Sequence, residues 1–293
     1  MKKKLGILLV ILAVILSAFT GCGSQKEKEK DVLTLGFVPL IDGDKLVEST
    51  EPLAEVLSKA IGKKVKIVTS TNYVGVVEGI SASKIDFGII PPFAYVLANK
   101  ESNAQVILKA LNKEGKSFYR SQFFVNKDSG IKTPKDIKGK KVAFVDPSSS
   151  SGYLYPGAFL KKNGIDLEKD IQVVYSGGHD KSLQLLLNRD VDVIAVYEGA
   201  REKYQKEFEG IMEQTETLCY SDNIPYISVT VRGDMSPELR EQIKEGLLKG
   251  LNGEEGKRIT IELFNLYGFE EAKDNDYDGI RTTAELMDID LTK

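Results

Sequence analysis

Apolar runs of strand length alternate with helical patterns along most of this chain. A run at 32–38 is followed by a helical pattern that we expect to open at Thr50 and Pro52, since a hydroxyl residue and an early proline mark helix starts. The next run, 64–69, is followed by a helical pattern over 73–83. Strands that alternate with helices are typical of a parallel sheet covered on both faces. The alternation therefore predicts an α/β fold.

The alternation stops near 126–136 and then restarts, which predicts a second lobe. Two further runs, 119–125 and 226–231, flank the restarted part, and we interpret them as two crossings between the lobes. We therefore expect two α/β lobes, each with a mainly parallel sheet flanked by helices. The predicted division places 32–124 plus 226–293 in lobe 1 and 125–225 in lobe 2.

A run of serines, Ser148 to Ser151, lies between an expected strand at 141–145 and an expected helix that ends near Gly164. The first N–H groups of a helix have no partner inside it, and the helix dipole adds partial positive charge there. With serine hydroxyls as further donors, such a turn can bind a phosphate-like anion. The alternative is an ordinary serine N-cap in a polar loop.

Two more loops follow expected strands of the same lobe, at 176–180 and 197–199. In open α/β sheets, ligands lie beyond the carboxyl ends of the strands, so we expect these loops and the serine turn to meet at one crevice. They would bring together hydroxyl groups, the single histidine of the chain, His179, and the carboxylate of Glu198.

Four motifs resemble one known family. They are Asp-Pro-Ser-Ser-Ser-Ser-Gly-Tyr-Leu-Tyr-Pro at 146–156, Tyr-Ser-Gly-Gly-His-Asp at 175–180, and the segments 119–131 and 274–281. Together they resemble the phosphate-, phosphite- and phosphonate-binding subunits of ABC importers. The resemblance covers nearly the whole chain after residue 21. The resemblance implies a type II periplasmic-binding-protein fold that closes on its ligand between two lobes.

The resemblance also implies roles for individual residues. Ser148, Ser149 and Ser150 would bind the phosphorus oxyanion, with the helix N-terminus behind them. His179 would donate to an oxyanion oxygen; its alternative is a solvent-exposed loop histidine. Two first-lobe tyrosines of the family, which close over the ligand, match Tyr73 and Tyr119, although Tyr73 can equally be a plain surface or core residue.

Two carboxylates match those that meet the ligand's amino group in aminoalkylphosphonate binders. They are Glu198 and Asp222. Glu198 can equally accept a proton from a monoanionic ligand. Asp222 has the alternative of a turn residue before Ile224 and Pro225.

The N-terminus resembles a bacterial lipoprotein signal. Lysines at positions 2–4 precede an apolar run at 5–19, and Gly21 stands directly before Cys22. We expect residues 1–21 to be removed, Cys22 to be lipidated and 22–31 to be a flexible tether. The chain would then be anchored at the extracytoplasmic face of the cell membrane. The alternatives are a plain signal peptide or an uncleaved anchor.

Charge and motifs limit the remaining function classes. Without the lysines at positions 2–4 the chain carries 37 basic and 43 acidic residues, a net charge of −6, which argues against nucleic-acid binding. We find no Walker loop, zinc-helix motif or G-x-S-x-G elbow, and we expect no cofactor and no resident metal. An EF-hand-like pattern runs from Asp274 to Glu285, but Arg281 occupies a position that is usually apolar.

The resemblance implies a non-enzymatic, monomeric solute-binding subunit that delivers a phosphorus oxyanion to an ABC permease. One alternative is a surface lipoprotein that senses the same ligand for a membrane receptor. Another is an enzyme on this fold that processes phosphoesters or phosphonates. Phosphate, phosphite, alkylphosphonates and aminoalkylphosphonates share the oxyanion, and the sequence does not distinguish them.

Overall fold

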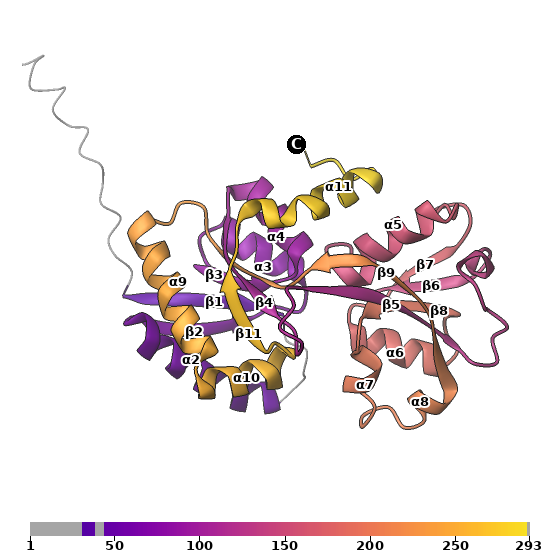
Figure 1. Ribbon diagram of the computed structural model, residues 1–293, viewed down its shortest axis with the longest axis horizontal. Helices are drawn as coiled ribbons and strands as arrows, with labels where there is room; N and C mark the ends of the chain where they lie inside the picture. Colours follow the sequence, from indigo (N-terminus) through magenta and orange to yellow (C-terminus); the bar gives the residue numbers. More distant parts are fainter. Residues whose placement is uncertain (1–30, 39–43, 292–293) are drawn as a thin grey trace, which may run out of the picture. The chain divides into compact units, whose positions relative to one another are not determined.

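The computed structural model describes residues 31–38 and 44–291, which form two sheets flanked by helices (Figure 1). The predicted signal segment 1–21, Cys22 and all but the last residue of the predicted tether lie outside the described residues. Within the described part of the chain, no helix is long and apolar enough to span a bilayer.

The first sheet has six strands in the order β11-β4-β10-β3-β1-β2. β1 is parallel to β2 and β3, β10 is antiparallel to β3 and β4, and β11 is antiparallel to β4. β1 to β4 therefore share one direction, as the alternation with helices predicts. The strands are β1 (Val32–Phe37), β2 (Lys64–Thr69), β3 (Phe87–Ile90), β4 (Gln105–Leu111), β10 (Ser228–Val231) and β11 (Gly268–Glu271).

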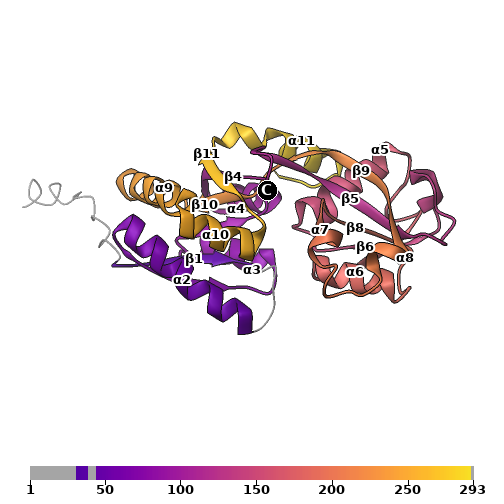
Figure 2. The same cartoon turned by 60° about the horizontal axis from the view of Figure 1, so that its bottom comes forward.

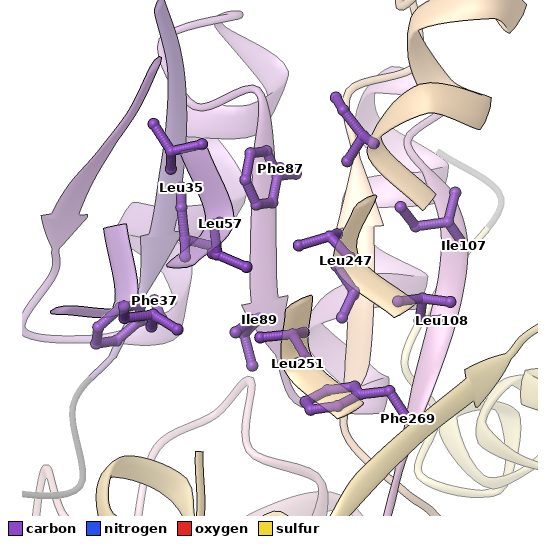
Figure 3. Close-up of a cluster of buried hydrophobic side chains, with 14 of the residues drawn as sticks. Leu35, Phe37, Leu57, Phe87, Ile89, Ile107, Leu108, Leu247, Leu251 and Phe269 are labelled. Carbon is purple, nitrogen blue, oxygen red and sulfur yellow. The ribbon is translucent and has the colours of Figure 1, made fainter. Parts of the chain in front are cut away.

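One face of this sheet packs against α2 (Asp44–Ile61), α9 (Pro237–Asn252) and α10 (Glu254–Phe264). The buried side chains of Leu57 on α2, Phe87 on β3 and Leu247 on α9 belong to this core (Figure 3). Full burial of one such side chain is worth about 1.5–3 kcal/mol, so the cluster fixes the helices on the sheet.

The other face carries α3 (Tyr73–Ser81), α4 (Pro92–Ser102) and, after the short helix η3 (Asp274–Tyr277), α11 (Asp278–Leu286). The same cluster includes Leu154 and Tyr155, which belong to the second half of the chain. Apolar packing therefore continues from the first sheet to the segment that follows the serine turn.

The second sheet has five strands in the order β7-β6-β8-β5-β9. β6 is parallel to β7 and β8, whereas β5 is antiparallel to β8 and β9. The strands are β5 (Phe118–Asn126), β6 (Lys141–Phe144), β7 (Gln172–Tyr175), β8 (Val193–Tyr197) and β9 (Thr215–Pro225). The helices are η1 (Pro134–Ile137), η2 (Ser150–Leu154), α5 (Tyr155–Lys162), α6 (His179–Leu187), α7 (Ala200–Lys203) and α8 (Ile211–Gln214).

The chain passes between the sheets on two adjacent connections. β5 and β9 lie side by side and pair from Phe118↔Pro225 to Asn126↔Thr215 (Figure 1, Figure 2). Next to the Phe118↔Pro225 end of this pair, the N–H of Tyr226 donates to the carbonyl of Ser117 at 2.9 Å. The predicted lobe boundary at residue 124 thus runs through β5, a strand whose partners are all in the second sheet.

The first long helix begins earlier than expected. The sequence predicts a start at Thr50 and Pro52, but α2 begins at Asp44 and Pro52 lies inside it. This expectation was wrong because Pro52, although it removes one helical hydrogen bond and crowds the carbonyl four residues earlier, does not end the helix. The apolar stripe of Leu53, Leu57 and Ile61, all buried, compensates by packing α2 on the sheet.

Candidate ligand-binding site

The serine turn is a tightly hydrogen-bonded reversal between β6 and η2. The N–H of Val145 donates to the carbonyl of Gly152 at 2.8 Å, and the N–H of Ser149 donates to the carbonyl of Asp146 at 2.9 Å. A Cβ atom on Gly152 would lie 2.5 Å from the side chain of Val145. The turn therefore needs glycine at position 152 for close approach rather than for an unusual φ angle.

The serine hydroxyls of this turn have different partners. The Oγ of Ser149 accepts from the N–H of Gly152 at 3.0 Å, which leaves its own O–H free to donate. Ser148 gives its O–H to the Asp146 carboxylate, and the Oγ of Ser150 accepts from the N–H of Phe93 on α4 at 2.9 Å. Ser149 and Ser151 line a cavity, whereas Ser148 and Ser150 are not among its lining residues.

His179 is the first residue of α6 and also lines the cavity. Its Nδ1 accepts from the N–H of Tyr197 at 3.4 Å, and its ring meets the Tyr197 ring edge-on with the centroids 4.8 Å apart. Burial lowers the pKa of His179 to about 3. At neutral pH the imidazole is therefore uncharged, with its proton on Nε2, which makes that nitrogen a donor.

Besides Tyr197, three tyrosines line the cavity: Tyr73, Tyr119 and Tyr226. The rings of Tyr119 and Tyr226 meet edge-on with the centroids 5.1 Å apart. Burial raises the pKa of Tyr73 and of Tyr119; for Tyr119 a hydrogen bond with Ser151 partly opposes this. Both phenols therefore keep their protons near neutral pH and can donate. Tyr226 was missed from sequence because it stands at the start of an apolar run.

The two predicted carboxylates lie in different environments. Glu198, directly after β8, lines the cavity and forms an ion pair with Arg120 of β5 at 2.5 Å. Asp222 pairs with Lys162 at 2.7 Å, its side chain is 70% exposed, and it does not line the cavity. The structure thus brings together Tyr73, Tyr119, Ser149, His179 and Glu198 but leaves Asp222 outside.

The cavity itself is small and receives residues from both sheets. Its volume is about 60 Å³, several times the roughly 10–15 Å³ that one water molecule needs. The remaining lining residues are Pro91, Tyr197, Ile227, Phe264, Asn265 and Leu266. Because hydroxyl, phenol, imidazole and amide groups share the wall, the cavity offers neutral hydrogen-bond donors to a small polar ligand.

Three carboxylates of the EF-hand-like pattern are engaged by cations of the chain. Asp274 and Asp278 both accept hydrogen bonds from Arg281, and Asp276 accepts from Lys109 at 3.0 Å. The segment is helical, as η3 and the start of α11. In the residues that the structure describes, no group of three or more His, Cys, Asp or Glu side chains is arranged to hold a metal ion.

A family model described as the periplasmic substrate-binding protein of phosphonate ABC transporters matches residues 35–277. The phosphate-import protein PhnD of Mycolicibacterium smegmatis is 30% identical over 96% of this chain and 95% of that protein. The phosphonates-binding periplasmic protein of Escherichia coli is 24% identical over 75% of this chain and 66% of its own length.

Solved structures support the fold. PhnD1 of Prochlorococcus marinus, crystallised with methylphosphonate, aligns with a TM-score of 0.78 at 21% identity, covering 89% of this chain and 99% of that one. A phosphonate-transporter binding protein of Pseudomonas aeruginosa aligns with a TM-score of 0.77 at 23% identity, covering 86% and 85%. The two-lobed periplasmic-binding-protein fold predicted from the sequence is confirmed. The chain therefore belongs to the family of periplasmic substrate-binding proteins of phosphonate ABC transporters.

Proposed function

We propose that this chain captures a phosphorus oxyanion, namely a phosphonate, phosphite or phosphate, in the cavity between its two sheets and delivers it to an ABC permease. One observation carries the proposal: neutral donors from separate elements line a single small cavity. They are Tyr73, Tyr119, Ser149, Ser151 and His179. The relatives named for phosphate import and phosphonate binding support the same ligand class.

The cavity suits an anion because its donors keep their protons. Tyrosines with a raised pKa do not ionise near pH 7, and His179 with a pKa of about 3 does not titrate there. A hydrogen bond to a charged group contributes about 1.5–3 kcal/mol, so a few such donors suffice for tight binding. Ser149 is the N-cap of η2, which continues directly into α5, so the helix dipole adds partial positive charge at this end.

Binding would be coupled to closure of the two lobes. Tyr73 comes from α3 beside the first sheet, whereas Ser149 and the first residue of α6, His179, come from the second. A ligand that contacts all three is bound best when the lobes are together, and it shifts the population toward that state.

We infer a carrier rather than an enzyme. A general base near pH 7 needs a pKa close to that value, and His179 lies far below it. Its Nδ1 is already engaged by a backbone N–H, and the Ser149 Oγ accepts from Gly152 rather than donating to a base. The ligand should therefore leave the cavity chemically unchanged.

We further propose that the protein acts as a monomer held at the extracytoplasmic face of the membrane by lipid on Cys22. The sequence pattern at 1–22 supports the lipid anchor. Those residues lie outside the described part of the structure.

The ligand proposal is tested by calorimetric titration of the full-length chain, purified in detergent, with phosphate, phosphite, methylphosphonate and 2-aminoethylphosphonate. Sulfate serves as the tetrahedral control that lacks phosphorus. We expect saturable binding of at least one phosphorus ligand and its recovery unchanged after release. Absence of binding across the phosphorus panel, or steady conversion of a bound ligand, would overturn the proposal.

A further inference from the structure

The charge balance of the cavity points to one residue that does not line it. Among the described residues that line the cavity, Glu198 is the one with a formal charge near neutral pH, since His179 is uncharged and the tyrosines are protonated. A bare carboxylate at this place would repel an oxyanion and attract an ammonium group. The ligand class therefore depends on what neutralises Glu198.

Arg120 supplies that neutralisation with a two-point contact. Its Nε donates to Oε2 of Glu198 at 3.1 Å, and its Nη2 donates to Oε1 at 2.5 Å. The planar guanidinium matches a carboxylate in this fork geometry, which a lysine cannot reproduce. Both oxygens of Glu198 are thus occupied by one cation of the chain.

The pair is built into the strand register. Ser121 of β5 stands opposite Tyr197 of β8, and the N–H of Glu198 donates to the carbonyl of Arg120 at 3.0 Å. On its other side, the guanidinium lies 4.0 Å from the ring centroid of Tyr220 on the neighbouring strand β9. Backbone pairing and ring stacking therefore hold Arg120 beside Glu198 without a ligand.

Arg120 lies on the outer side of the carboxylate. An open groove of about 600 Å³ adjoins the cavity and shares Tyr119, Glu198, Tyr226 and Asn265 with it, and Arg120 lines this groove only. The guanidinium therefore acts on the cavity through Glu198. The other predicted amine partner, Asp222, is exposed and already paired with Lys162.

We propose that Arg120 is a specificity-determining residue: by masking Glu198 it selects phosphorus oxyanions without a cationic substituent and disfavours aminoalkylphosphonates. The inference rests on the proposed function. An ammonium group would have to displace the guanidinium from its two-point contact with both oxygens of Glu198. An uncharged alkyl group, a hydrogen or a hydroxyl at the same position of the ligand does not have to displace the guanidinium from Glu198.

The experiment compares ethylphosphonate with 2-aminoethylphosphonate, which differ by the cationic amine, and includes phosphate. Calorimetry is run on the full-length wild type, Arg120→Gln, Glu198→Gln and the double variant. The matched control is Arg189→Gln, because Arg189 makes a similar two-point pair with Asp128 at 3.1 and 2.8 Å, away from the cavity. Thermal unfolding checks that each variant is folded.

We expect wild type and Arg189→Gln to prefer ethylphosphonate. Arg120→Gln should bind ethylphosphonate and phosphate at least about tenfold more weakly and should reverse the preference toward 2-aminoethylphosphonate. Adding Glu198→Gln should return oxyanion affinity to within about twofold of the Glu198→Gln variant, because the masked charge is then gone.

Three results overturn the inference while leaving the proposed function intact. They are a wild-type preference for 2-aminoethylphosphonate, unchanged oxyanion affinity in Arg120→Gln, and a double variant that binds as weakly as Arg120→Gln. The last would mean that the guanidinium contacts the ligand itself. A wild type that binds no phosphorus ligand overturns the proposed function and this inference together.

Discussion

The backbone N–H of Tyr197 donates to Nδ1 of His179 over 3.4 Å, and this bond assigns the imidazole proton to Nε2. The donor comes from the last residue of β8, and the acceptor from the first residue of α6. The end of a strand thus sets the tautomer of a side chain at the start of the neighbouring helix. The histidine reaches the cavity as a neutral donor, and its charge state cannot follow physiological changes in pH.

Burial of His179 should make the free energy of unfolding depend on pH. The folded pKa of His179, about 3, lies below the ordinary value of 6.5, so the unfolded chain binds more protons between those values. Stability contributed by the neutral ring is complete above pH 6.5 and is lost as pH falls. Between pH 7 and pH 5 wild type should lose about 2 kcal/mol more unfolding free energy than His179→Gln. Urea unfolding at the two pH values measures this, and equal losses would contradict it.

Adjacent serines should differ in their effect on binding. Ser149→Ala removes a hydroxyl that can donate to the ligand, which costs about 1.5–3 kcal/mol, or roughly ten- to a hundredfold in affinity. Ser148→Ala is the matched control, because that hydroxyl is given to Asp146 and is not part of the cavity wall. Calorimetry with the best ligand of the panel should show the large loss for Ser149→Ala alone. Equal losses would mean that the whole serine turn contacts the ligand.

The convergence of three loops could be predicted because it depends on strand order alone. Ser149, His179 and Glu198 each follow a strand of the second sheet, and parallel strands end at the same edge. The partners of those groups could not be predicted. Arg120 precedes Glu198 by 78 positions, and their contact follows from an antiparallel register that no local pattern encodes.

The sequence also does not show which of the two sheets β5 belongs to, for a related reason. The apolar residues Phe123, Phe124 and Val125 are fully buried, and such a run fits a central strand of either sheet. Only pairing with β8 and β9 decides it. Tyr226 and Asn265 escaped notice because a tyrosine or an asparagine at the end of an element carries no sign of facing a ligand.

Membrane attachment through lipid on Cys22 can be tested by substitution of that residue. Cys22→Ser removes the thiol that would carry lipid, so the protein should leave the membrane fraction or accumulate unprocessed. Cys219→Ser is the control, since burial raises the pKa of that thiol to about 12 and makes it unreactive. Fractionation with metabolic fatty-acid labelling measures both. Continued membrane retention of a cleaved, unlabelled Cys22→Ser chain would contradict lipid anchoring.

Ser150 should stabilise the arrangement in which the two lobes are together, and it should not contact the ligand. Its buried Oγ accepts from the N–H of Phe93, near the start of α4, where the N-cap Pro91 has no side-chain hydrogen bond to offer. The bond joins the serine turn to a helix on the first sheet. In Ser150→Ala that N–H is left buried without its partner, at a cost of about 1–3 kcal/mol to the arrangement with the lobes together.

Open lobes expose the same N–H to water, so Ser150→Ala should shift the population toward them. Affinity for every ligand of the panel should then fall by one common factor, which calorimetry measures. Small-angle scattering of the ligand-free variant should give a radius of gyration equal to or larger than that of wild type. Ser150→Thr keeps the acceptor and should bind like wild type. A loss that differs strongly among ligands in Ser150→Ala would instead place this hydroxyl on the ligand.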